Sequence, residues 1–151
     1  MDLLAELTAL IASLDRHRVE YAICGGIALA IHGVPRATQD IDLLAQEADL
    51  EPLRTAAREC GFVFESEPME FQQSGVTIVR FTKLVGVLPL MLDVLLAKGP
   101  ARRVWEGRQE ILFEGTRVKV VSREGLITLK LAAARPQDMV DIQRLAEVNR
   151  G

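Results

Sequence analysis

Hydrophobic residues recur along the chain with two periods, and the change between them divides the chain into predicted helices and strands. Spacings of three and four residues predict amphipathic helices over residues 2–17 and 50–60. An apolar run predicts a strand over residues 19–24, which ends at a Gly-Gly pair, and a short helix over residues 27–31 follows it. The first part of the chain is therefore predicted to run helix, strand, glycine turn and helix.

A period of two, with many β-branched and aromatic residues, dominates the middle of the chain. It predicts a short strand over residues 62–64 and a hairpin over residues 70–83. Residues 87–96 are predicted to form a strongly apolar strand, and residues 108–121 a second hairpin. The two hairpins indicate antiparallel strands in addition to the strand–helix–strand unit near the N-terminus.

Two helices are predicted at the end of the chain. Ser122 is a suitable N-cap for the first, over residues 124–134, which is apolar on nearly every side apart from Lys130. Pro136 opens the second, because proline is tolerated in the first turn of a helix. The positions expected to pack in this last helix are Met139, Ile142 and Leu145.

These elements predict an α/β fold in which helices flank a mixed β-sheet of four to six strands, with a short C-terminal helical pair. A length of 151 residues is typical of one domain and sufficient for a substantial core, so we expect a single domain over residues 1–151. The topology is expected to be mixed because the hairpins occur together with the strand–helix–strand unit.

Composition narrows the classes of function. The chain is 49% hydrophobic and 26% charged, as soluble globular proteins are. Its two cysteines, Cys24 and Cys60, lie in apolar surroundings, so we expect reduced core thiols and neither a disulfide framework nor a zinc site. The sequence shows no signal peptide and no apolar run long enough to span a membrane. We therefore expect a cytoplasmic protein without membrane contact.

Charge is distributed unevenly. The net charge of −3 does not suggest a general nucleic-acid binder, and no helix-turn-helix with basic recognition residues is recognisable, which disfavours a DNA-binding regulator. Residues 1–70 nevertheless carry a net charge of −8 and residues 98–130 one of +4. The asymmetry is suited to holding a polyanionic substrate, and a solvated surface of uneven charge is the open alternative.

The chemistry of the chain is concentrated after the first predicted strand. Asp40 and Asp42 lie on one face of a predicted strand, about 7 Å apart, and Ile41 lies on the other. Two carboxylates at this spacing repel each other unless a cation lies between them, and oxygen ligands suit Mg²⁺. A glycine turn that opens a helix suits an anion, because backbone N–H groups point towards it. A phosphate cradle beside a metal-binding carboxylate pair indicates a nucleotide site.

The spacing of these motifs resembles that of a known superfamily. Gly25-Gly26, thirteen further residues and then Asp40-Ile41-Asp42 resemble the signature of the DNA polymerase β-like nucleotidyltransferases. The run R-A-T-Q-D-I-D-L at residues 36–43 is similar to that of the AbiEii toxin-like branch. Residues 130–142 also resemble the C-terminal motif of this branch, a lysine, then an arginine or lysine, then paired aspartates.

The resemblance implies a metal-dependent enzyme that moves a nucleoside monophosphate from a nucleoside triphosphate, such as ATP, to an acceptor hydroxyl. The residues implied in phosphate binding are Gly25, Gly26 and Arg36. Asp40 and Asp42 are implied as ligands of Mg²⁺, with Mn²⁺ as an alternative, in a two-metal site. The catalytic residues implied are Asp93, Lys130 and Asp138.

Asp93 stands alone in an apolar predicted strand, where a carboxylate is costly unless it is paired or bound to a metal. A buried ion pair with an arginine is one interpretation. The resemblance favours the other, in which Asp93 is the third metal ligand and the base. Lys130 would neutralise charge on the leaving pyrophosphate, and Asp138 would orient Lys130. Asp141 shares a helix face with Asp138, and its role stays open.

The acceptor and the partners stay open between several kinds. The acceptor hydroxyl belongs to a tRNA, a protein or a small molecule, and the AbiEii resemblance implies a toxin with an antitoxin partner. The chain is little more than the catalytic core, which leaves room for an antitoxin or a homo-oligomer partner to complete the site. A catalytically inactive nucleotidyltransferase fold that only binds a partner is the alternative, and the three intact carboxylates argue against it.

Overall fold

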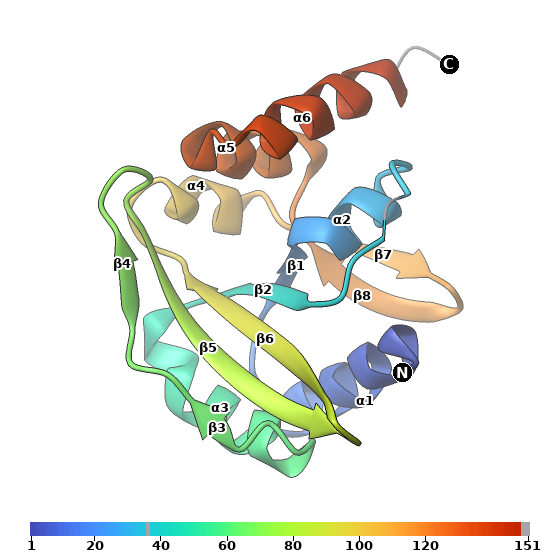
Figure 1. The fold of residues 1–151 in the computed structure, drawn as a ribbon, viewed down its shortest axis with the longest axis vertical. Helices are drawn as coiled ribbons and strands as arrows, with labels where there is room; N and C mark the ends of the chain where they lie inside the picture. Colours follow the sequence, from blue (N-terminus) through green and yellow to red (C-terminus); the bar gives the residue numbers. More distant parts are fainter. Residues whose placement is uncertain (36, 149–151) are drawn as a thin grey trace.

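The structure, a computed structural model, describes residues 1–35 and 37–148 (Figure 1). Its elements follow one another as α1 (Leu3–Arg16), β1 (Ala22–Cys24), α2 (Gly25–Ile31), β2 (Ile41–Ala45), η1 (Glu47–Asp49), α3 (Leu50–Glu59), β3 (Phe64–Glu65), β4 (Met69–Phe71), β5 (Val76–Val85), β6 (Leu88–Leu96), α4 (Ala101–Glu106), β7 (Gln109–Phe113), β8 (Thr116–Val120), α5 (Arg123–Ala133) and α6 (Pro136–Val148). The predicted helices and hairpins are all present, and the first strand is shorter than predicted.

Within the described residues, eight strands form one mixed sheet. The strand order is β3-β5-β6-β2-β1-β8-β7, and β4 also pairs with β5. The parallel pairs are β1 with β8 and β2 with β6, and the other pairs are antiparallel. The predicted mixed α/β architecture is confirmed. The sheet exceeds the predicted four to six strands because both predicted hairpins, β4–β5 and β7–β8, and the short strand β3 all join it.

Strand β2 lies at the centre of the sheet and of the core. It pairs with β1 on one side and β6 on the other, and Ile41, Leu43 and Leu44 are fully buried. One face of the sheet is covered by α1 and α3 (Figure 1), where the Ser13 hydroxyl donates to the Ala56 carbonyl at 2.9 Å. Because side chains alternate along a strand, Ile41 and Leu43 lie opposite to Asp42, as predicted.

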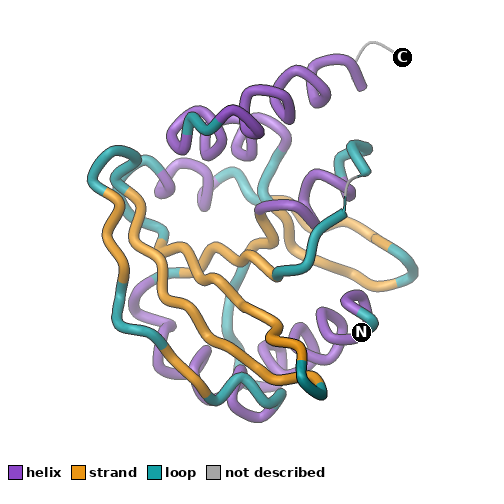
Figure 2. Tube along the Cα trace, in the orientation of Figure 1, coloured by secondary structure: helices purple, strands orange, loops and turns teal. Residues whose placement is uncertain are grey.

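The C-terminal helices lie apart from α1 and α3, beyond α4 and α2 (Figure 2). Helix α5 contacts α4, α6 and α2. Although its sequence is apolar on nearly every side, α5 is not buried all round, since Leu131 is 56% exposed. Met139, predicted to pack, is 43% exposed, because α6 turns Asp138 and Asp141 inward instead. The α5–α6 pair thus buries charged side chains and exposes some of its apolar ones.

The two cysteines differ in burial: Cys24 is buried, as predicted, whereas Cys60, also predicted to lie in the core, is half-buried. Cys24 and Cys60 are both free thiols. In the part of the chain that the structure describes, no helix combines the length and the apolar character that crossing a membrane requires.

The position of β2 yields a stability prediction. Leu43→Ala should lower the free energy of unfolding by about 2–5 kcal/mol, because it opens a cavity beside fully buried neighbours. The matched control is Leu88→Ala at the tip of the β5–β6 hairpin, where Leu88 is 54% exposed, and it should cost less than about 0.5 kcal/mol. Urea denaturation of both variants measures the difference, and equal losses would contradict the central position of β2.

Candidate active site

Four side chains form a row across the middle of the sheet. The strand register places Cys24 of β1 beside Asp42 of β2, Asp42 beside Asp93 of β6, and Asp93 beside Arg80 of β5. Residues paired in register point to the same face of a sheet. The row therefore brings together two of the predicted aspartates, which come from distant parts of the chain.

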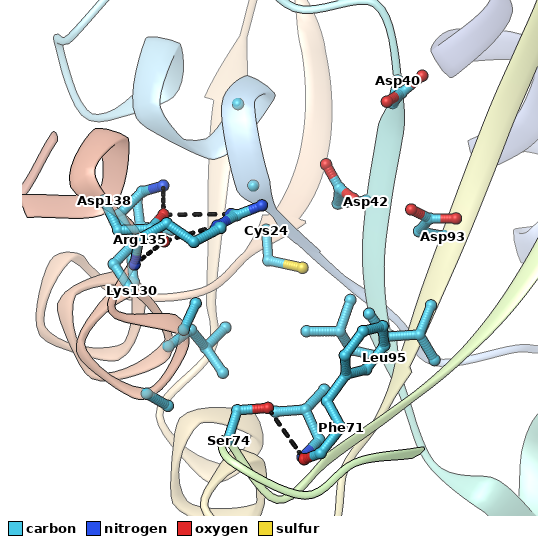
Figure 3. A pocket seen from close by; sticks show the side chains of 18 of the residues that line it. Cys24, Asp40, Asp42, Phe71, Ser74, Asp93, Leu95, Lys130, Arg135 and Asp138 are labelled. Atoms are coloured by element: carbon cyan, nitrogen blue, oxygen red, sulfur yellow. Dashed lines mark hydrogen bonds and ion pairs between the residues drawn. The ribbon is translucent and has the colours of Figure 1, made fainter. Parts of the chain in front are cut away.

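Asp40 lies beside this row. It immediately precedes β2 in the chain and is half-buried. Burial and the nearby charge of Asp93 raise the pKa of the Asp40 carboxyl, and the Arg80 guanidinium partly offsets them. The three predicted aspartates thus act on one another electrostatically. Figure 3 shows them side by side on adjoining strands.

The pKa of the Asp42 carboxyl is also raised. Burial, followed by the charges of Asp93 and Asp40, raises the pKa of Asp42 to about 7, although Lys130 and Arg135 lower it. A carboxyl whose pKa is raised in this way is held in surroundings that do not supply enough positive charge for its ionised form. A cation bound at this position would favour the ionised form.

The glycine pair stands against the carboxylate row. Gly25 has φ +66°, and a Cβ at this position would overlap the Asp42 carboxylate. A Cβ on Gly26 would overlap the side chain of Thr38. Cys24, the N-cap of α2, makes no side-chain hydrogen bond to the first turn. The glycines therefore allow the Asp42 carboxylate to lie directly against the backbone where α2 begins.

Asp93 is engaged by an arginine in the structure. Arg80 Nε donates to Asp93 Oδ1 at 2.7 Å and Arg80 Nη2 donates to Oδ2 at 3.0 Å. In the structure, Asp93 therefore makes the contacts of a buried ion pair with an arginine. The resemblance had favoured metal binding over this interpretation. The pair does not exclude a metal ligand, since an ionised carboxylate offers about four acceptor positions and this arginine takes two.

A second charged cluster lies at the junction of α5 and α6. The Lys130 ammonium, 8% exposed, lies 3.3 Å from Asp138 Oδ1 and 3.0 Å from Asp141 Oδ2. Arg135 Nε donates to Asp138 Oδ2 at 2.8 Å. Burial would raise the pKa of the Asp138 carboxyl, but the hydrogen bonds from Arg135 outweigh it and the pKa is lowered. Asp138 is therefore an ionised partner of Lys130.

One cleft of about 570 Å³ joins the two clusters. Figure 3 shows Lys130, Arg135 and Asp138 on one side and the three aspartates on the other, with Cys24 between them. The remaining wall is largely apolar and comes from β4, β5, β6 and α5; its residues include Phe71, Val76, Ile78, Leu95, Leu126 and Leu129. The cleft thus has a charged half suited to phosphates and metal, and an apolar half suited to an organic group.

Seven of the eight residues predicted for the site line this cleft: Gly25, Gly26, Asp40, Asp42, Asp93, Lys130 and Asp138. Arg36, predicted to contact phosphate, lies outside the described residues. Arg80, Arg135 and Asp141 were not assigned to the site from sequence. Period-two alternation puts Arg80 on the face opposite to buried Val79 and Phe81, but only the register with β6 shows its partner.

The donor set fits a divalent ion that is shared with a substrate. Among the described residues, no three side chains of Asp, Glu, His or Cys converge tightly enough to enclose a metal by themselves. Mg²⁺ is usually held by one or two carboxylates together with waters and substrate phosphates, so a complete protein cage is not required. Asp42 and Asp93, adjacent in register, and Asp40 beside them supply only oxygen ligands of the kind Mg²⁺ prefers.

Solved structures similar to this chain share its fold. ANT(2")-Ia in complex with adenylyl-2"-tobramycin is 20% identical, with a TM-score of 0.62, and the match covers 99% of this chain and 90% of that one. A candidate nucleotidyltransferase from Thermotoga maritima is 14% identical, with a TM-score of 0.65 and coverages of 96% and 92%. The lincosamide antibiotic adenylyltransferase LnuA, bound to lincomycin, is 12% identical, with a TM-score of 0.61 and coverages of 95% and 96%.

The sequence itself matches a protein family. A comparison with curated proteins gives no match. The profile of the family described as "Nucleotidyl transferase AbiEii toxin, Type IV TA system" matches residues 7–151, nearly the whole chain. The chain therefore belongs to the AbiEii family of nucleotidyltransferases.

Proposed function

We propose that this nucleotidyltransferase moves a nucleoside monophosphate from a nucleoside triphosphate to an acceptor hydroxyl, with Mg²⁺ or Mn²⁺ as cofactor, and releases pyrophosphate. The proposal rests on one observation: the aspartates and the glycine turn line the same cleft. Asp42 and Asp93 stand in register on neighbouring strands, and the Gly25-Gly26 turn lies directly against Asp42. Triphosphate and metal would therefore share one site.

The phosphate groups are proposed to lie between the glycine turn and the α5–α6 junction. Gly25 and Gly26 line the cleft, beside the Asp42 carboxylate and the Thr38 side chain respectively. Lys130 would stabilise charge that develops on the leaving pyrophosphate, and Asp138 would keep its ammonium in place. Arg135, whose guanidinium contacts Asp138, adds a second positive charge at this end of the cleft. Arg36 is proposed as a further phosphate contact.

We propose that the carboxylates bind the metal ions and that one of them accepts a proton. Asp40 and Asp42 would hold the ion that grips the triphosphate, and together with Asp93 they would hold a second. A bound divalent ion supplies neutralisation of phosphate charge and lowers the pKa of the attacking hydroxyl. Asp93, a carboxylate fixed in an ion pair with Arg80 and adjacent to Asp42 in the row, is proposed to accept the hydroxyl proton.

A small molecule is the acceptor that we propose to test first, because ANT(2")-Ia and LnuA were solved with adenylyl-tobramycin and lincomycin. A tRNA and a protein are the other acceptors. The family description names a type IV toxin–antitoxin system, so we propose that the protein works as its toxin component in the cytoplasm and that an antitoxin is its partner.

The shared site predicts that nucleotide binding depends on the metal. ATP should bind with Mg²⁺ and at least about tenfold more weakly after EDTA treatment, because the carboxylate row would otherwise repel the triphosphate. Isothermal titration calorimetry with and without EDTA measures this, and Asp42→Asn should bring the two affinities together. Equal ATP affinity of the wild-type protein with and without metal would contradict the shared site.

The position of Lys130 predicts that its role can be tested only with a compensating change. Lys130→Met alone should destabilise the protein by about 3–5 kcal/mol, since it leaves buried Asp138 and Asp141 without their ammonium partner. The double variant Lys130→Met/Asp141→Asn removes one charge of each sign and should fold. Its rate of nucleotidyl transfer should fall by about 10²–10³.

The control for this experiment is Asp141→Asn alone, which keeps Lys130 beside Asp138. It should retain transfer within about tenfold of the wild-type rate, because one carboxylate still holds the ammonium. The role proposed for Lys130 is wrong if the folded double variant transfers nucleotide as fast as this control.

A further inference from the structure

Arg80 contacts the carboxylate row through two hydrogen bonds to Asp93. Its Nε and Nη2 atoms donate to the two oxygens of Asp93 at 2.7 and 3.0 Å, a bidentate fork. The two residues are cross-strand neighbours on β5 and β6, so the strand pairing itself fixes their separation. A fork of this kind prevents the carboxylate from rotating about its Cβ–Cγ bond.

The charge of Arg80 reaches beyond its partner. The hydrogen bond to Asp93 raises the pKa of Arg80, and the charges of Asp40 and Asp42 raise it further. In return, the guanidinium partly offsets the rise in the pKa of the Asp40 carboxyl that burial and Asp93 cause. Arg80 is therefore electrostatically coupled to all three aspartates of the row, although it touches only one.

The location of the pair argues against a purely structural role. The side chain of Arg80 is 42% exposed and lines the cleft, while that of Asp93 is 11% exposed. An apolar pair at these two positions would be as good or better for stability, because a carboxylate loses its hydration in the sheet. Both residues instead present polar atoms to the space where substrate is proposed to bind.

Charge balance gives the pair a consequence for cation binding. With all three carboxylates in the ionised form that metal binding requires, the three aspartates and Arg80 carry a formal charge of −2, which a single divalent ion neutralises. A second divalent ion would bind to a site that is already neutral. It would therefore need the negative charge of a triphosphate, which arrives with the substrate.

We propose that Arg80 is a positioning residue of the transfer site: it fixes the Asp93 carboxylate and acts as a resident cation that limits metal binding until a nucleoside triphosphate is present. This inference rests on the proposed function for its catalytic consequence only. The guanidinium takes one acceptor position on each Asp93 oxygen, and the remaining positions stay free for a metal ion or the acceptor hydroxyl. Arg80 thus shapes the reaction through Asp93 rather than through contact with the reacting atoms.

Binding of Mn²⁺ to the nucleotide-free protein tests the inference without turnover. Arg80→Met keeps much of the aliphatic stem and removes the charge, so it should bind Mn²⁺ about tenfold more tightly than the wild-type protein. Arg80→Lys keeps the charge and loses the fork, and its Mn²⁺ affinity should stay within about threefold of wild type. Electron paramagnetic resonance of free Mn²⁺ gives both dissociation constants, and melting temperatures verify folding.

The chain offers a matched control in Arg54. It forms the same bidentate fork with Glu65, at 2.6 and 2.9 Å, between α3 and β3 and outside the cleft. Arg54→Met should leave Mn²⁺ affinity unchanged, although it breaks an equivalent pair.

Transfer rates add the second readout. Both Arg80 variants should lower kcat by about 10–100-fold and leave the KM for nucleotide within about threefold, because a rotating Asp93 is misplaced but the phosphate contacts remain. Unchanged Mn²⁺ affinity in Arg80→Met would overturn the inference. Absence of transfer by the wild-type protein would count against the proposed function and leave the Mn²⁺ result standing.

Discussion

The crowding of three carboxylates is the constraint on which the rest of the site depends. Asp42 and Asp93 are neighbours in register, Asp40 lies beside them, and burial of the row makes their mutual repulsion costly. The fold maintains this arrangement because the other face of β2 and β6 packs in the core that α1 and α3 cover. An arrangement that costs stability in the empty protein becomes favourable once a cation binds. In the proposed function, the bound metal ions would supply the missing positive charge.

Local patterns in the sequence were sufficient to predict much of the fold. Helical periodicity located α1 and α3, the N-cap Ser122 located the start of α5, and alternation located the two hairpins, because these signals arise within each element. The parallel pairing of β2 with β6 joins segments distant in sequence, and no local pattern encodes its register. The resemblance grouped Asp93 with Asp40 and Asp42 in one metal site, but the register that places Asp42 on one side of Asp93 and Arg80 on the other comes from the structure.

The C-terminal helices show where apolar patterning misleads. The predicted packed face of α6 included Met139, yet the structure buries Asp138 and Asp141 and exposes Met139. These carboxylates turn inward because the Lys130 ammonium is itself buried and needs partners. A sequence pattern that counts apolar residues cannot reveal that one buried lysine reverses the preference of the adjoining helix. Lys130, Asp138 and Asp141 consequently form one unit that must be altered together.

The measurement that tests this account most directly is the pH dependence of stability in metal-free protein. The pKa of Asp42 is about 7 in the folded chain, against 3.8 for an ordinary carboxyl, so the folded state retains a proton that the unfolded chain loses. Stability should therefore fall as pH rises from about 4 to about 7. Asp42→Asn should be increasingly more stable than wild type over this range, by on the order of 1–3 kcal/mol at pH 8. A difference between the two proteins that does not change between pH 5 and pH 8 would contradict the carboxylate crowding on which the site rests.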